Sequence, residues 1–269
     1  MTIPVFEELD NKATPIGNIS LRRRTEPRLD GKMVYEVKLD EDFLMSSLFT
    51  EAEVELAKLG LAALASDPDF DRNALDVIVG GLGLGYTAAA ALEHSCVESL
   101  TVVELLRPVI EWHRRGIVPL GEQICKDSRC TLLAADFFAM ALSDGGFYPD
   151  TPSRKAHAIL LDIDHSPSHW LNTEHGALYS QPGLQKIAAK LRPDGIFGLW
   201  SDDPPDSDFM NLLESAFVSV ESHVIAFPNP YTGGESANTV YLARNAAADE
   251  NRAESPSSGR VSTLSRRAK

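Results

Sequence analysis

The residues of this sequence best suited to chemistry are a glycine-rich run and several carboxylates downstream of it. The run is Gly80-Gly81-Leu82-Gly83-Leu84-Gly85, between an apolar segment, 75–79, and an alanine-rich one, 86–92. Glycines at such a turn tolerate positive φ angles and let the backbone approach a ligand, while the amides that open the next helix face the bound molecule. The run therefore predicts a nucleotide or nucleoside site.

Two acidic residues follow the run where a nucleoside would need them. Glu104 ends the next apolar segment, about 20 residues on, and a carboxylate there can accept hydrogen bonds from both ribose hydroxyls. Asp136 precedes Phe137, so it can accept from an adenine amino group beside an aromatic face. Asp136 is equally well placed to cap the short helix expected after it, and neither role excludes the other.

The spacing of the glycines separates two classes of nucleotide. The dinucleotide fingerprint is G-x-G-x-x-G, whereas Gly81, Gly83 and Gly85 give G-x-G-x-G. This spacing favours an adenosyl donor, either S-adenosylmethionine or its decarboxylated form, as the bound molecule. A dinucleotide such as NAD is the alternative.

A second candidate segment, Asp162-Ile163-Asp164-His165, comes at the end of another apolar run. Open α/β sheets bind ligands beyond the carboxyl ends of their strands, so we expect chemistry there. Asp162 and Asp164 together could hold an ammonium group. Asp162 could also accept the proton that an amine loses as it attacks a sulfonium carbon.

Two other interpretations of this segment stay open. Asp164 and Ser166 could merely organise the turn before Pro167. A metal site built from the two aspartates with His165 and His169 is a weaker alternative, because Pro167 interrupts the helix that would align the imidazoles. We therefore expect no metal.

The chain has 269 residues, of which 43% are hydrophobic, enough for one α/β domain with an addition. Its net charge of −14 and pI of about 4.9 would repel a phosphate backbone, which argues against nucleic acid as a partner. A cationic substrate would be attracted, although an ordinary acidic protein has the same charge. No segment reaches the roughly 18 apolar residues of a membrane span, so we expect no membrane partner and a cytoplasmic protein.

Apolar segments alternate with amphipathic ones along most of the chain, which predicts a Rossmann-like α/β fold with helices on both faces of a seven-stranded, mainly parallel sheet. The last two strands should form an antiparallel pair at its edge. We expect strands over 75–79, 100–104, 131–135, 157–163, 195–200, 218–226 and 238–243, and helices over 85–94, 107–115, 137–142, 175–191 and 207–216.

The segments before and after this alternation differ in composition. Residues 18–23 and 33–39 flank Asp30-Gly31, which predicts a small β-hairpin element. Thr50 and Glu53 have capping-box spacing and predict the start of a helix that ends near residue 66. From 246 onward large apolar residues are almost absent, which predicts a disordered tail. The expected units are thus 1–66, the donor-binding domain 67–245 and the tail 246–269.

Taken together, these segments resemble the spermidine synthase family of polyamine aminopropyltransferases, and more closely its bacterial spermidine-synthase-like branch. They span roughly Asp76 to Trp200, about half of the chain. The segments that carry the resemblance are Val79–Gly85, Thr101–Glu104, Ala135–Phe138, Leu161–Asp164, Leu178–Ser180 and Leu191–Phe197.

The resemblance implies a methyltransferase-type fold, a glycine loop and Glu104 around the adenosyl group, Asp136 at the adenine and Asp162 as the proton-accepting carboxylate. It also implies a mobile loop over about 164–177 and often a homodimer. We expect Asp164, His165 and Tyr179 to bind the substrate, and Gly80, Gly81, Gly83, Gly85 and Phe137 to complete the donor site.

The sequence departs from the family pattern on the substrate side. Gly83 stands where the glycine loop of the family carries an acid that helps to hold the amine of the donor. The usual Asp-x-x-Asp pair is here Asp162-x-Asp164, and the Tyr-His pair that helps to bind polyamine is replaced around Met45-Ser46-Ser47.

The leading hypothesis is therefore transfer of an aminopropyl group from decarboxylated S-adenosylmethionine to an amine such as putrescine. A methyltransferase that uses ordinary S-adenosylmethionine and a non-catalytic nucleoside-binding protein are the alternatives.

Overall fold

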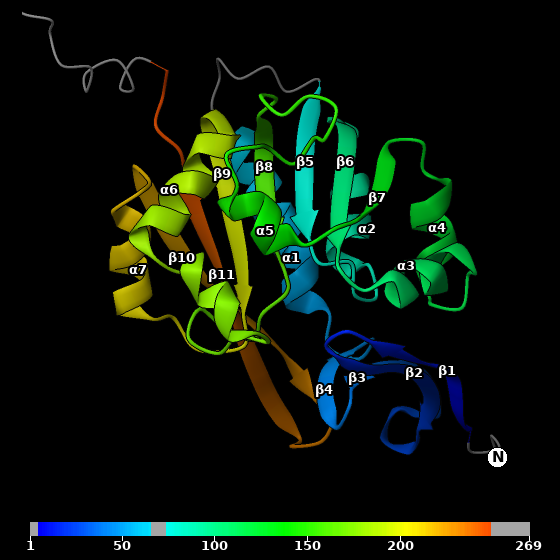
Figure 1. The fold of residues 1–269 in the computed structure, drawn as a ribbon. Coiled ribbons are helices and arrows are strands. Elements are labelled where there is room, and N and C mark those ends of the chain that lie inside the picture. Colours follow the sequence, from blue (N-terminus) through cyan, green and yellow to red (C-terminus); the bar gives the residue numbers. More distant parts are fainter. Residues whose placement is uncertain (1–4, 66–73, 249–269) are drawn as a thin grey trace, which may run out of the picture.

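The computed structural model describes residues 5–65 and 74–248, which form a four-stranded sheet and a seven-stranded sheet covered by helices (Figure 1). The predicted boundary at residues 66 and 67, and residues 249–269 of the predicted tail, lie outside the described residues. None of the described helices is long and apolar enough to cross a membrane.

The seven-stranded sheet confirms the predicted α/β class. Its strand order is β10-β11-β9-β8-β5-β6-β7, with the first five strands in sequence parallel and β11 antiparallel to both β9 and β10. The strands are β5 (Leu75–Gly80), β6 (Val97–Glu104), β7 (Cys130–Ala134), β8 (Ala156–Leu161), β9 (Leu191–Ser201), β10 (Ser219–Asn229) and β11 (Gly234–Arg244). The order reverses between β5 and β8, and ligands of open α/β sheets bind at such a point.

Helices cover both faces because the central strands are apolar on both sides. Val77 and Val79 pack into one core with the first four helices, whereas Ile78 between them packs into a second core with the last three. The first group is α1 (Glu51–Ala65), α2 (Tyr86–Leu92), α3 (Arg107–Arg114) and α4 (Gly121–Lys126), and the second is α5 (Phe137–Leu142), α6 (Gln181–Lys190) and α7 (Ser207–Glu214).

The helix expected over 175–191 is wrong as one element. The structure has a short 3₁₀ helix, η2 (Thr173–Ala177), and then α6. Ser180 is the N-cap of α6, and its hydroxyl accepts a hydrogen bond from the amide of Gly183, with Pro182 in the first turn. Proline lacks the amide that a continuous helix would need, so a new helix begins here.

The N-terminal sheet is larger than the predicted hairpin. Its order is β1-β2-β3-β4, all antiparallel, with strands β1 (Phe6–Thr14), β2 (Gly17–Glu26), β3 (Lys32–Leu39) and β4 (Asp42–Ser46). The predicted pair is β2 and β3, and Asp30 and Gly31 have the positive φ angles, 53° and 79°, that favour this dipeptide at a turn.

This sheet meets the tip of the β10-β11 hairpin, far away in sequence (Figure 1). Tyr231 accepts a hydrogen bond from Arg24 Nη2 at 2.7 Å and donates one to Glu26 Oε2 at 2.9 Å. Phe49 packs against Phe227 with ring centroids 5.4 Å apart. The N-terminal sheet, through β2, therefore lies against the hairpin formed by the last two described strands.

Candidate functional site

The loops after β5 and β8 meet where the strand order reverses. The amide of Asp162 donates to the carbonyl of Gly80 at 2.8 Å. Gly81 has a φ of +94°, and a Cβ atom at that position would collide with the carbonyl oxygen of Asp162. Glycine at position 81 is therefore required both by the backbone angle and by the approach of the second loop.

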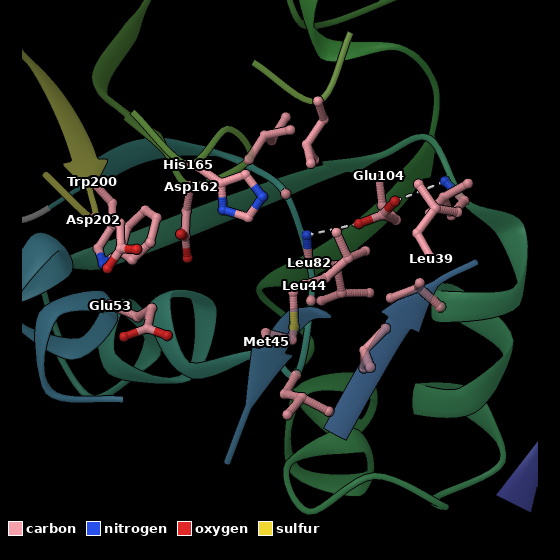
Figure 2. Close-up of a pocket in the computed structure, with 18 of the residues that line it drawn as sticks. Leu39, Leu44, Met45, Glu53, Leu82, Glu104, Asp162, His165, Trp200 and Asp202 are labelled. Atoms are coloured by element: carbon pink, nitrogen blue, oxygen red, sulfur yellow. Dashed lines mark hydrogen bonds between the residues drawn. The ribbon is translucent and has the colours of Figure 1, made fainter. Parts of the chain in front are cut away.

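A cavity of about 700 Å³ opens at this point, between the glycine loop, the N-terminal sheet and the loops after β8 and β9. Figure 2 shows one part of it walled by apolar side chains, among them Leu39, Leu44 and Met45. Among the described residues that line the cavity there are five carboxylates and neither lysine nor arginine: Glu53, Glu104, Asp136, Asp162 and Asp202.

Glu104 holds one side of the glycine loop. Its Oε2 accepts from the amide of Leu82 at 2.9 Å, and its Oε1 accepts from the amide of Leu106 at 2.7 Å (Figure 2). Burial raises the pKa of Glu104, while these backbone hydrogen bonds act in the opposite direction. The carboxylate predicted to bind ribose thus lies on the cavity and fixes the loop.

Three carboxylates, Glu53, Asp162 and Asp202, gather at the other side of the cavity, which we call the acidic end (Figure 2). Oδ2 of Asp162 accepts from the hydroxyl of Thr87 at 2.7 Å, and Oδ1 of Asp202 accepts from Nδ2 of Asn238 at 2.7 Å. Glu53 reaches this place from the first turn of α1.

Burial raises the pKa of two carboxyl groups at the acidic end, and repulsion adds to the effect on Glu53. Burial raises the pKa of Asp162 to about 6, against the hydrogen bond from Thr87, which lowers it. Burial and, after it, the negative charges of Asp162, Glu51 and Asp202 raise the pKa of Glu53 to about 8, against a hydrogen bond from its own amide, which lowers it. A cation between these groups would relieve the repulsion.

Gly83 lies under Met45 of the N-terminal sheet. Its φ is +49°, and a Cβ atom on it would lie 2.7 Å from Sδ of Met45. Met45 therefore fills the space that a side chain at position 83 would need. The carbonyl oxygen of Gly83 also lies 2.9 Å from Nε2 of His113, a fully buried residue.

Asp164 and Tyr179 were predicted to bind substrate, but neither is among the residues that line the cavity. The carboxylate of Asp164 is buried and accepts from the amide of Leu171 at 2.9 Å and from the hydroxyl of Tyr179 at 3.0 Å, and it lies 2.8 Å from Nδ1 of His175. Asp164 thus organises the loop after β8, the role that the turn interpretation gave it. His165 does line the cavity, next to Asp162 (Figure 2).

The remaining predicted donor residues surround the glycine loop. Asp136 lines the cavity and also caps α5, accepting from the amide of Ala139 at 3.1 Å. Phe137 packs on Gly80, which has no room for a side chain there. Gly85 begins α2 with a φ of 93°.

Sequence reasoning missed Glu53, Trp200 and Asp202. The capping-box spacing predicted that Glu53 caps the N-terminus of α1. The amide of Thr50 instead donates to the Glu51 carboxylate at 2.9 Å, and Glu53 lines the cavity. Trp200 and Asp202 lie at the carboxyl end of β9. The rule that pointed to Asp162 could have found them, because all parallel strands end at this edge.

The predicted alternative of a metal site has no counterpart in the described part of the chain. There, no group of three or more histidine, cysteine, aspartate or glutamate side chains is arranged to hold a metal ion.

The chain is similar in sequence to two curated enzymes. It is 27% identical over 164 residues to polyamine aminopropyltransferase 2 of Pseudomonas aeruginosa, a match that covers 57% of this chain and 43% of the relative. It is 25% identical over 166 residues to polyamine aminopropyltransferase 2 of Hyperthermus butylicus, covering 58% and 49%. The chain thus spans about half the length of the curated relatives it matches. No family model matches it.

The fold is similar to those of solved spermidine synthases. The structure from Thermotoga maritima superposes with a TM-score of 0.64 at 19% identity, covering 88% of this chain and 72% of the other. A spermidine synthase in complex with the transition-state analogue AdoDATO gives the same TM-score and coverage at 17% identity. The sequence relatives are thus polyamine aminopropyltransferases, and the fold is one that solved spermidine synthases share.

Proposed function

We propose that this chain is a spermidine-synthase-like transferase, which moves an aminopropyl group from decarboxylated S-adenosylmethionine to an amine acceptor such as putrescine. The observation that carries the proposal is the acidic end of the cavity, adjoining the glycine loop, with neither lysine nor arginine among the described lining residues. The decarboxylated donor carries a sulfonium and an ammonium group, and an acidic cavity attracts both. Ordinary S-adenosylmethionine also carries a carboxylate, which the same cavity repels.

In this proposal the cavity binds the two parts of the donor at opposite sides. Glu104 accepts from the ribose hydroxyls, and Asp136 accepts from the adenine amino group. The backbone of the glycine loop lies against the sulfonium of the donor, because glycines at positions 81 and 83 leave no side chain in between. The names of the sequence relatives, both polyamine aminopropyltransferases, are consistent with this donor.

The reaction needs one base. The acceptor nitrogen attacks the carbon bonded to sulfur, a new C–N bond forms, and the C–S bond breaks with its electron pair left on sulfur. The sulfonium becomes the neutral thioether of methylthioadenosine, and the new ammonium loses a proton. Asp162, with a pKa that burial raises to about 6, accepts that proton and is still ionised at neutral pH.

The proposal is tested with the purified full chain, either donor and a panel of di- and polyamines, with products identified by mass spectrometry. Methylthioadenosine and an aminopropylated amine are the expected products. S-adenosylhomocysteine with a methylated product would replace the proposal by a methyltransferase. Donor binding without any product would indicate a non-catalytic nucleoside-binding protein.

A further inference from the structure

Glu53 differs from the other carboxylates of the acidic end because, among the described residues, only its own backbone amide donates a hydrogen bond to its carboxylate. Asp162 accepts from Thr87, and Asp202 accepts from Asn238. Within residues 5–65 and 74–248, no other residue donates a hydrogen bond to the Glu53 carboxylate or forms an ion pair with it. A partly buried carboxylate that receives a hydrogen bond from its own amide alone keeps unused acceptor capacity, which makes this side chain available to a ligand.

The glycine loop cannot hold a positive charge with a side chain of its own. Position 83 is a glycine with a φ of +49°, and Met45 fills the space beside it. The thioether of Met45 is apolar and offers no compensation for an ammonium group. Any anionic partner at this part of the cavity must therefore come from α1 or from the loops after β8 and β9.

The surroundings of Glu53 also call for a cation. The ionisable groups that act on it are Asp162, Asp202 and Glu51. Burial and, after it, the charge of Glu53 raise the pKa of Tyr86. All of these groups are acidic. An ammonium ion beside Glu53 would replace the proton that burial and repulsion keep there.

Resting on the proposed function, we infer that Glu53 binds the ammonium group of the aminopropyl tail of the donor. Asp162 is thereby left free to accept the proton from the attacking amine. Glu104 and Glu53 lie on opposite sides of the cavity, with Leu82 of the glycine loop and Met45 between them (Figure 2). This arrangement suits an elongated donor with its ribose at Glu104 and its amine at Glu53.

Two ligands that share the adenosyl group separate this contact from those of the adenosine. Decarboxylated S-adenosylmethionine has the aminopropyl tail and a sulfonium charge, whereas methylthioadenosine lacks the tail and is a neutral thioether. Their affinities are measured by isothermal titration calorimetry on the full chain and on Glu53→Gln, which keeps the shape and removes the charge. The matched control is Glu55→Gln, on the same helix, because Glu55 pairs with Lys58 at 3.3 Å and does not line the cavity.

Glu53→Gln should weaken the decarboxylated donor by at least about tenfold, the loss of one charge-assisted hydrogen bond, and methylthioadenosine by less than about twofold. Glu55→Gln should change neither affinity. Retained methylthioadenosine binding shows that the variant is folded. Should the glutamine variant fail to fold, Glu53→Asp replaces it, and the expected result is a selective but smaller loss of donor affinity.

The inference is overturned if the variant that binds methylthioadenosine normally also binds the donor normally, or if both ligands weaken equally. Binding of methylthioadenosine without measurable binding of the donor by the unmodified chain also overturns it, while the adenosyl site stands. Failure of the unmodified chain to bind either ligand overturns the proposed function itself.

Discussion

The hydroxyl of Thr87 lies 2.7 Å from Oδ2 of Asp162, so the first turn of α2 fixes the carboxylate that follows β8. This contact joins the two loops that meet where the strand order of the sheet reverses. It also opposes the effect of burial, because a hydrogen bond to the charged form of a carboxyl group lowers its pKa. A residue in the first turn of α2 thereby lowers the pKa of the proposed base.

Replacing Thr87 with valine removes the donor and keeps the shape of the side chain. The pKa of Asp162, about 6 in the unmodified chain, should rise. The acidic limb of the kcat/KM profile should therefore move to higher pH by about half a unit or more, the size of one modest hydrogen bond. An unchanged limb in an active variant would contradict the role of this contact.

Asp162→Asn removes the proposed proton acceptor. We expect kcat to fall by about 100-fold or more, which is typical for loss of a general base, while methylthioadenosine affinity changes little. Steady-state kinetics and calorimetry on one preparation separate the two effects. A variant that retains more than about a tenth of kcat would point to another base.

Asp164→Ala should act on stability more than on chemistry. Three donors, on Leu171, His175 and Tyr179, lose their acceptor, which we expect to cost about 3 kcal/mol of the free energy of unfolding. Urea unfolding measures this loss, and limited proteolysis should cut the loop after β8 faster. A variant as stable as the unmodified chain would argue for a role of Asp164 in substrate binding instead.

Glu53 should make stability depend on pH. Its pKa is about 8 in the folded protein and 4.5 for the free side chain, so the folded state keeps a proton that the unfolded chain releases. Its contribution to stability is complete below pH 4.5 and is lost as pH rises through about 8. Glu53→Gln cannot ionise, so the variant should not lose this stability at high pH.

The gain in Tm from Glu53→Gln should thus be larger at pH 9 than at pH 5, by at least about 2 °C, which corresponds to roughly 1 kcal/mol or less. Differential scanning calorimetry of the variant and of the control Glu55→Gln checks this. Equal gains at the two pH values would mean that Glu53 is not buried enough to retain its proton.

Met45 and Gly83 should be energetically coupled. An aspartate at position 83 tolerates the positive φ but collides with the thioether, and we expect Gly83→Asp to cost about 1–3 kcal/mol of unfolding free energy. In the Met45→Ala background the same substitution should cost less, by about 0.5 kcal/mol or more. A double-mutant cycle of urea unfolding measures the difference, and strict additivity would show that the two sites relax independently.

The sheet could be predicted from the sequence because its central strands are buried on both faces. β5 and β8 are buried along their whole length and are apolar except for Asp76 and His157. β1 could not be predicted, since it is an exposed edge strand rich in charge, and pairs such as Arg23 with Glu7 leave no alternation of apolar residues. α4 is short and polar, so its periodicity is weak.

The site was predictable only where residues directly follow apolar strands. Glu104 ends β6, Asp136 and Asp162 follow β7 and β8, and all three line the cavity. Asp164 follows β8, as Asp162 does, but its side chain points into its own loop. The amide of Leu171 and the ring of His175 hold it there, and sequence spacing does not reveal these contacts. The place of Glu53 in the cavity could not be predicted, because its spacing from Thr50 suits a capping box. Only the tertiary structure shows that Glu51 accepts the hydrogen bond from the amide of Thr50.

The contact of Tyr231 with Arg24 and Glu26 joins the N-terminal sheet to a hairpin that is synthesised much later. The cavity wall includes Met45 from β4 and Asn238 from β11, so a chain emerging from the ribosome cannot enclose a ligand until nearly all of its sheet has been made. Any intermediate that ends before β11 would expose the acidic end without closing it. Closure of the cavity is thereby a late event, and binding of the proposed nucleoside ligand would report on completed folding.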